Sequence, residues 1–365
     1  MTGHQPPTQC VQSRRARLTG AMRAANLEAV LVTDLVNVRY LTGFTGSNGA
    51  ALIDADDGTW LATDNRYELQ AAEQSPDTTL LIARSPLAVL AETALAQAFQ
   101  RTGFEDKNVT VAEFTQLTTD APIEWVGIGD LTQQLRATKD DFELGLLREA
   151  CLATSRALEK VLPKIAVGVT ELEVARLLDD AMRDLGTGGP GFDTIVATGP
   201  NSAVPHHEPT GRRIAPGDFV KMDFGARVGG YHADMTRTVV VGEPQAWQQE
   251  IYQLVARAQQ VGRDALTPGV AATEVDRAAR EVIATAGFGE QFGHGLGHGV
   301  GLEIHEVPFL GATSTDRIEA TVPVTVEPGV YLPGRGGVRI EDTVVVHHDR
   351  VEILTPFPRD LIVVA

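Results

Sequence analysis

Residues 292–306, FGHGLGHGVGLEIHE, carry three of the nine histidines of this 365-residue chain, interleaved with glycines. Glycine at this density disfavours a helix and lets backbone and ligands approach closely. The spacing does not match the G-x-G-x-x-G of dinucleotide-binding loops, and the stretch lacks the H-E-x-x-H of zincins. Two interpretations remain open: a flexible loop with incidental histidines, or a loop that brings imidazoles to a site.

Two aspartates lie upstream in a predicted hairpin. Residues 218–224 and 232–241 have the pattern of strands, and the glycines between them predict a turn. With Val228-Gly229 at the tip, Asp223 and Asp234 face each other directly. Opposed like charges destabilise a strand pair, so this pairing needs a cation or a protonated carboxyl. The alternative is two unrelated surface aspartates near a turn.

Two glutamates lie downstream, in or beside apolar runs. Glu327 follows the run 322–326, and Glu341 lies inside the predicted strand 338–347. An acidic residue in a buried strand is costly unless it is paired or bound to a metal. Arg339 projects from the same strand face as Glu341, because strand side chains alternate. It either forms a salt bridge with Glu341 or orients Glu341 as a metal ligand.

Together these residues predict a metal centre. Four carboxylates and one imidazole form an oxygen-dominated ligand set that suits manganese, cobalt, iron or zinc. Four carboxylates also balance the charge of two divalent ions, which can lie about 3.5–4 Å apart and share a water. The candidate ligands are Asp223, Asp234, His298, Glu327 and Glu341.

A further histidine pair, His206 and His207, follows Pro205 in a predicted loop. Loop histidines are often simply solvated. Residue type and position leave a functional role and a solvated role equally open.

The composition narrows the class of protein. The formal net charge of −17 argues against nucleic acid and against an anionic membrane surface as partners. Cys10 and Cys151 are too few and too far apart for a thiolate zinc site or a disulfide framework. The N-terminus lacks the apolar segment of a signal peptide, and no apolar run reaches the roughly 18 residues of a membrane helix. We therefore expect a cytoplasmic protein.

The length and pattern predict two domains. Residues 1–137 alternate helices and short apolar strands in the manner of an α/β layer, with elements expected at 14–25, 27–32, 50–53, 60–63 and 87–100. Residues 138–365 follow the order helix, helix, strands twice, without a residue-level repeat. Each half of this second domain supplies two of the four carboxylates.

Several motifs, in order along the chain, resemble those of the pita-bread metallopeptidases: DFG at 223–225 and ADMTRT at 233–238, HGLGHGVGLEIHE at 294–306, VEPG at 326–329 and RIED at 339–342. The first part, with NVRYLTGFTGSNGA and TDNRY, is similar to the creatinase/prolidase N-terminal domain. Within the family, the chain is similar to the Xaa-Pro dipeptidase and aminopeptidase P group, in particular to actinobacterial cytoplasmic peptidases called PepQ. The resemblance implies a creatinase/prolidase-like α/β domain over residues 1–137, followed by an α+β pita-bread catalytic domain over residues 138–365 with two pseudo-twofold halves.

The resemblance also implies a role for each candidate ligand. Asp223 would hold one of two divalent ions. Asp234 and Glu341 would bridge both ions. His298 and Glu327 would complete the other ion, and Glu327 would also shuttle the proton of the attacking water.

Other polar residues match family positions near the substrate. His206, His294 and His305 match histidines that stabilise the tetrahedral intermediate and assist proton transfer. His206 is matched in preference to His207 because the family histidine directly follows the proline. Arg339 matches an arginine that orients the ligands.

The implied function is metal-dependent hydrolysis of the N-terminal Xaa-Pro bond of short peptides by a hydroxide that bridges two divalent ions. Mn²⁺ is expected, with Co²⁺ or Zn²⁺ as alternatives, and the chain is expected to form a homodimer. A methionine aminopeptidase shares the five ligands, but the N-terminal domain and the RIED context argue against it. Creatinase shares the fold without the metal set. A non-catalytic binding module of this fold would have lost ligands, whereas all five are present here.

Overall fold

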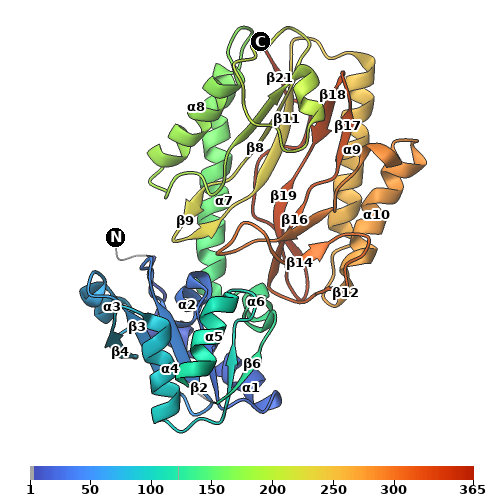
Figure 1. Cartoon of the computed structure of the whole chain (residues 1–365). Helices are drawn as coiled ribbons and strands as arrows, with labels where there is room; N and C mark the ends of the chain where they lie inside the picture. The colour runs from blue at the N-terminus through green and yellow to red at the C-terminus, as the bar shows by residue number, and fades with distance from the viewer. Residues whose placement is uncertain (1–3, 122) are drawn as a thin grey trace. The chain divides into compact units, whose positions relative to one another are not determined.

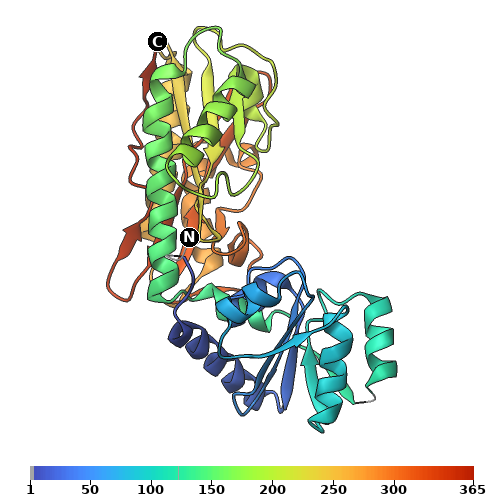
Figure 2. The same cartoon turned by 90° about the vertical axis from the view of Figure 1, so that its left-hand side faces the viewer.

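The computed structural model describes residues 4–121 and 123–365 of the chain (Figures 1 and 2). The chain divides into two compact units, Met1–Arg136 and Ala137–Ala365. Each unit contains hydrophobic clusters of its own. Among the described residues, every helix is too short or too polar to cross a bilayer.

The first unit is built on a six-stranded mixed sheet with the order β4-β3-β2-β1-β5-β6. The central strand β1 is fully buried and pairs in parallel with β5 and antiparallel with β2. The predicted α/β layer is therefore present. Its elements are α1 (Thr8–Ala24), β1 (Ala29–Val32), α2 (Leu35–Thr42), β2 (Ala50–Asp54), β3 (Thr59–Thr63), α3 (Glu68–Gln74), β4 (Thr79–Ile82), α4 (Pro86–Ala96), β5 (Arg101–Phe104), α5 (Val111–Asp120), β6 (Glu124–Gly127) and α6 (Leu131–Ala137).

The helix expected at 87–100 was predicted too long. Helix α4 ends at Ala96, and Ala98 lies in the left-handed region with φ of 59°. A residue with a Cβ avoids that region within a helix, so the chain turns there.

The second unit repeats one arrangement twice (Figure 1). Helices α7 and α8 pack on the sheet β21-β11-β8-β7, and helices α9 and α10 accompany the sheet β14-β13-β16-β19-β20. The elements are α7 (Asp141–Val161), α8 (Glu171–Asp184), β7 (Ile195–Thr198), β8 (Phe219–Phe224), β9 (Arg227–Val228), β10 (Tyr231–His232), β11 (Met235–Val241), α9 (Ala246–Asp264), β12 (Val270–Ala271), α10 (Ala272–Thr285), β13 (Gly297–Gly299), β14 (Glu306–Leu310), β15 (Arg317–Ile318), β16 (Val322–Val326), β17 (Gly329–Leu332), β18 (Gly336–Arg339), β19 (Asp342–Val346), β20 (Val351–Ile353) and β21 (Val363–Val364).

The glycine-rich stretch around β13 forms part of this second sheet. A Cβ on Gly297 would lie 2.1 Å from the Thr325 carbonyl oxygen on β16. Only glycine allows the two backbones to approach this closely. The interpretation of the stretch as a flexible loop is therefore wrong at its centre, where Gly297–Gly299 form strand β13.

The predicted register of the hairpin is wrong by two residues. The turn lies at Gly229-Gly230, so Asp223 pairs with Thr236 rather than with Asp234. A shift of two residues keeps every side chain on its original face, because strand side chains alternate with a period of two. Asp223 and Asp234 therefore remain neighbours, and the charge of Asp223 contributes to raising the pKa of Asp234.

The predicted strand at 338–347 is two strands. It breaks at Ile340-Glu341 into β18, which pairs with β17, and β19, which pairs with β16 and β20. The break places Glu341 between two sheets instead of within one.

Helix α8 begins with a capping box. The Thr170 hydroxyl accepts a hydrogen bond from the Glu173 backbone N–H at 3.2 Å, and the Glu173 carboxylate accepts one from the Thr170 backbone N–H at 2.8 Å. These bonds satisfy N–H groups that have no partner within the helix.

We expect Thr170→Ala to lower the free energy of unfolding by about 1 kcal/mol, because the substitution removes the N-cap acceptor. Urea unfolding followed by circular dichroism measures this loss. Thr170→Ser keeps the hydroxyl and is the control. Equal unfolding midpoints for the alanine variant and the unmodified chain would contradict the expected role of the cap.

Candidate active site

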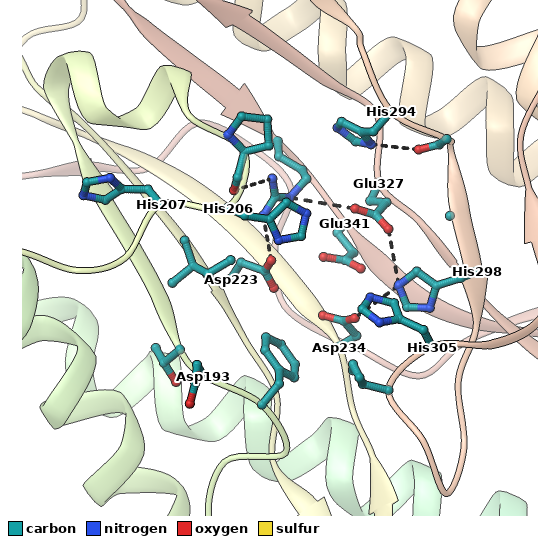
Figure 3. A pocket seen from close by; sticks show the side chains of 18 of the residues that line it. Asp193, His206, His207, Asp223, Asp234, His294, His298, His305, Glu327 and Glu341 are labelled. Carbon is teal, nitrogen blue, oxygen red and sulfur yellow. Dashed lines mark hydrogen bonds and ion pairs between the residues drawn. The ribbon is translucent and has the colours of Figure 1, made fainter. Parts of the chain in front are cut away.

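Five candidate ligands meet between the two sheets of the second unit (Figure 3). Asp223 lies on β8 and Asp234 immediately precedes β11. His298 lies on β13, Glu327 follows β16, and Glu341 lies between β18 and β19. All five side chains line one cavity of about 590 Å³.

The ligand atoms lie close enough to share a cation. One atom each of Asp234, His298 and Glu341 lies within 4.8 Å of the others. His298 Nε2 is 3.6 Å from Asp234 Oδ2 and 3.4 Å from Glu327 Oε1. The structure thus brings together residues that are up to 118 positions apart in the chain, from Asp223 to Glu341.

The site holds more negative charge than the surrounding protein neutralises. Among the described residues, Asp223 Oδ1 and Glu341 Oε1 are buried without a hydrogen-bond partner. Burial, reinforced by the neighbouring carboxylates, raises the pKa of Asp234 and of Glu341 well above the usual range. Burial also raises the pKa of Glu327 to about 7. The ionised carboxylates therefore require a bound cation.

His298 offers its free lone pair to this cluster. Its Nδ1 lies 2.9 Å from the Gly299 carbonyl oxygen, which can only accept, so Nδ1 carries the proton. Burial lowers the pKa of the imidazole to about 4, which leaves Nε2 unprotonated near neutral pH. Nε2 is the atom that faces Asp234 and Glu327, so the tautomer suits a metal ligand.

Arg339 orients the carboxylates of Asp223 and Glu341, the first directly and the second through Thr236. Its Nη2 donates to Asp223 Oδ2 at 2.6 Å, and its Nε donates to the Thr236 hydroxyl at 3.0 Å. That hydroxyl donates in turn to Glu341 Oε2 at 2.6 Å. The expected alternative of a direct salt bridge between Arg339 and Glu341 is wrong, because Thr236 stands between them. Both carboxylates keep their other oxygen for a cation.

His294 is bonded on both sides within the protein. Its Nδ1 donates to the Gly295 carbonyl at 2.8 Å, and its Nε2 accepts from the Tyr331 hydroxyl at 2.9 Å. Arg339 Nη1 donates to the same hydroxyl at 2.9 Å. Burial and the charge of Arg339 lower the pKa of His294 to about 4, so the imidazole is neutral.

The two adjacent loop histidines differ in direction (Figure 3). His206 points toward the carboxylates, whereas His207 turns away and bonds Glu171 at 2.9 Å. His305 is exposed to the cavity, and its ring lies edge-on to His298 with centroids 4.4 Å apart. His206 and His305 are thus the histidines left open to a ligand.

Several contributors were missing from the sequence prediction. Thr236 and Tyr331 connect Arg339 to the ligands and to His294, and Phe192 and Phe309 line the cavity. For Thr236 and Tyr331 the only signal in the sequence is position: Thr236 lies two residues after Asp234, and Tyr331 lies four residues after Glu327. Apolar residue types alone do not separate a cavity wall from a core.

Comparison with known proteins identifies the family. The family model described as "Metallopeptidase family M24" matches residues 145–348. The model described as "Creatinase/Prolidase N-terminal domain" matches residues 14–138. The chain belongs to metallopeptidase family M24. As a member, it is a metal-dependent hydrolase with the creatinase N-terminal domain and the catalytic domain expected from the motifs.

Several similar proteins match the chain over nearly their whole length. The chain is 34% identical to the Xaa-Pro dipeptidase of Pyrococcus furiosus over 362 residues, which are 96% of this chain and 100% of the relative. Among solved structures, the Xaa-Pro dipeptidase from Bacillus anthracis has a TM-score of 0.93 at 37% identity, covering 97% of this chain and 99% of that one. The X-Pro aminopeptidase from Thermotoga maritima has a TM-score of 0.89 at 35% identity, with 96% and 99% covered.

The raised carboxyl pKa values predict an unusual pH dependence for the metal-free chain. The pKa of Glu327 is about 7 in the folded state, against an ordinary value of 4.5. The folded chain therefore keeps this proton up to a higher pH than the unfolded chain does. The contribution of Glu327 to stability is present below the ordinary pKa and is lost as the pH rises through about 7. A bound divalent ion would take the place of this proton. We therefore expect added Mn²⁺ to raise the melting temperature of the EDTA-treated chain more near pH 8 than near pH 5.

Glu341→Gln tests the source of this effect. The variant removes a buried negative charge, so we expect the metal-free form to melt higher near pH 8 and to respond less to Mn²⁺. Glu250→Gln, at an exposed position, is the control and should behave as the unmodified chain. A metal response that is independent of pH would contradict the assignment.

Proposed function

We propose that the chain is a dinuclear Xaa-Pro peptidase, which hydrolyses the bond between the first residue of a short peptide and a following proline. The observation that carries the proposal is the convergence of four carboxylates and His298 on one cavity, with buried oxygens of Asp223 and Glu341 left for a cation. The proline preference is supported by the names of the relatives, which are Xaa-Pro dipeptidases and an X-Pro aminopeptidase.

The residues present fit two divalent ions. Asp223, Asp234, His298, Glu327 and Glu341 would hold them, and four carboxylates balance their charge. The oxygen-rich set supports Mn²⁺, with Co²⁺ or Zn²⁺ as alternatives. When bound, the ions would acidify a water and polarise the scissile carbonyl.

Glu327 is the acid–base group of the proposed mechanism. Its carboxylate lines the cavity beside His298, where it would take a proton from the attacking water and then give it up. Thr325 donates to Glu327 Oε1 at 3.3 Å and so helps fix the direction of the carboxyl group. The leaving proline nitrogen needs this proton before it can depart.

His206 and His305 form the substrate side of the site. Both are exposed to the cavity and open to a ligand. They would donate hydrogen bonds to the carbonyl oxygen as it gains negative charge. His294 would act less directly, since both of its ring nitrogens are bonded inside the protein; it holds the Tyr331 hydroxyl against Arg339.

The charges around the cavity favour peptides longer than a dipeptide. Arg339 is the only arginine or lysine among the described lining residues, and Asp223 already pairs with it. Asp193 and Glu208 are exposed carboxylates on the same cavity. A free carboxylate directly on the proline would meet negative charge, whereas an amide there would not.

Three further assignments stay predictions from the sequence: a homodimer, a cytoplasmic location and a special similarity to actinobacterial PepQ. Short proline-containing peptides remain the expected ligands, and nucleic acid and membranes are not expected as partners.

Metal reconstitution tests the reaction. We expect the metal-stripped protein to be inactive and to regain cleavage of Ala-Pro-Ala with Mn²⁺ or Co²⁺, because the ions acidify the attacking water. Peptide products are measured by chromatography. Met-Ala-Ala distinguishes the methionine aminopeptidase alternative: cleavage of that peptide alone would refute the proline preference. Absence of metal-dependent cleavage of Ala-Pro-Ala, Met-Ala-Ala and the dipeptide Ala-Pro alike would favour a binding module.

Charge on the substrate tests peptide length. We expect kcat/KM for Ala-Pro-amide to exceed that for Ala-Pro by about tenfold, because like charges disfavour binding. The two substrates differ in little but the carboxylate. Asp193→Asn combined with Glu208→Gln removes two negative charges from the cavity. This double variant should therefore bring the two kcat/KM values closer together. Faster hydrolysis of Ala-Pro would show that a cation reaches the proline carboxylate and that the enzyme is a dipeptidase.

A further inference from the structure

Lys221 is a fully buried lysine that the proposed mechanism does not use. It lies on β8, two residues before Asp223 and on the same strand face. Its Nζ donates to the Val204 carbonyl at 2.6 Å and to the Pro205 carbonyl at 3.2 Å. It also lies 5.0 Å from the centroid of the Tyr331 ring. A buried amine is costly, and here both of its bonds go to one loop.

This loop is anchored on either side of His206. On one side Lys221 holds the Val204 and Pro205 carbonyls. On the other side the His207 ring bonds the buried carboxylate of Glu171 at 2.9 Å. His206 is the residue between the anchors, and it is the one whose ring points into the cavity (Figure 3).

The two anchors restrain the backbone and leave the His206 ring free. Arg339 Nη1 also donates to the Pro205 carbonyl, at 3.2 Å, whereas Lys221 is the donor to the Val204 carbonyl. Val204 is 48% exposed. We therefore expect removal of the amine to loosen a partly exposed loop and to leave the bond between Arg339 and Asp223 in place.

We propose that Lys221 is a positioning residue that sets the placement of His206 toward the scissile carbonyl through the Val204 and Pro205 carbonyls. The inference rests on the role of His206 proposed above. Both hydrogen bonds of Lys221 go to the loop, so we expect its effect on the reaction to pass through the loop. Loss of Lys221 should then matter only while His206 is present.

A double-mutant cycle on the full-length, Mn²⁺-loaded enzyme tests this coupling. Lys221→Met keeps the length of the side chain and removes its donors. We expect Lys221→Met to lower kcat for Ala-Pro-Ala by roughly 10- to 100-fold with less than about a threefold change in KM, because small displacements of a catalytic group are costly. In the His206→Ala background, the same change should lower kcat by less than about threefold.

Val220→Ala is the matched control. Val220 is the adjacent residue on β8, but it belongs to the cluster packed against α7 and α8 on the opposite face. This variant removes buried volume from the same strand without touching the loop. We expect its effect on kcat to be the same with and without His206. Lys221→Thr, which suits a strand and cannot reach the carbonyls, replaces Lys221→Met if that variant fails to fold.

The outcomes separate this inference from the proposed function. An unmodified enzyme that cleaves neither Ala-Pro-Ala nor Ala-Pro refutes the proposed function. An unchanged kcat in His206→Ala refutes the role of His206. With both intact, equal losses from Lys221→Met in the two backgrounds, an unchanged kcat, or loss of bound manganese measured by mass spectrometry would overturn the positioning role. Non-additive losses at full manganese content support it.

Discussion

Like charges buried between two sheets are the constraint on which this structure depends. Carboxylates from β8, the start of β11, the end of β16 and the β18–β19 junction converge on one cavity. Water cannot solvate the buried oxygens, and their mutual repulsion raises the pKa values of Asp234 and Glu341. Bound metal ions of opposite charge would resolve this conflict. The cost of the bare site and its affinity for metal therefore have the same origin.

The surrounding protein neutralises only part of that charge and fixes the direction of the rest. Arg339 pairs with Asp223 and reaches Glu341 through the Thr236 hydroxyl. Each carboxylate is thereby held by one oxygen, while its other oxygen stays without a protein partner. A buried oxygen without a hydrogen-bond partner lowers the stability of the folded chain and is retained where it serves function.

Much of the site was predictable because residue type carries its chemistry. Aspartates and glutamates beside apolar runs are costly in a core, so their presence there already indicated a ligand set. The register error of the Asp223 hairpin did not harm that prediction, since a shift of two residues leaves side chains on the same face. By contrast, the prediction of a single strand at 338–347 missed the break at Ile340-Glu341, which lets Glu341 reach the site.

The sequence by itself determined the two-domain order, the alternation of helices and strands, and the choice of candidate ligands, because these depend on local pattern and on side-chain chemistry. Only the tertiary structure decided that Arg339 bonds Asp223, that Tyr331 connects it to His294, and that Lys221 supports the loop before His206. Thr236 and Glu341, which share one hydrogen bond, are 105 residues apart. Contacts over such separations arise from the packing of whole sheets, and no local pattern encodes which donors the packing brings to which acceptors.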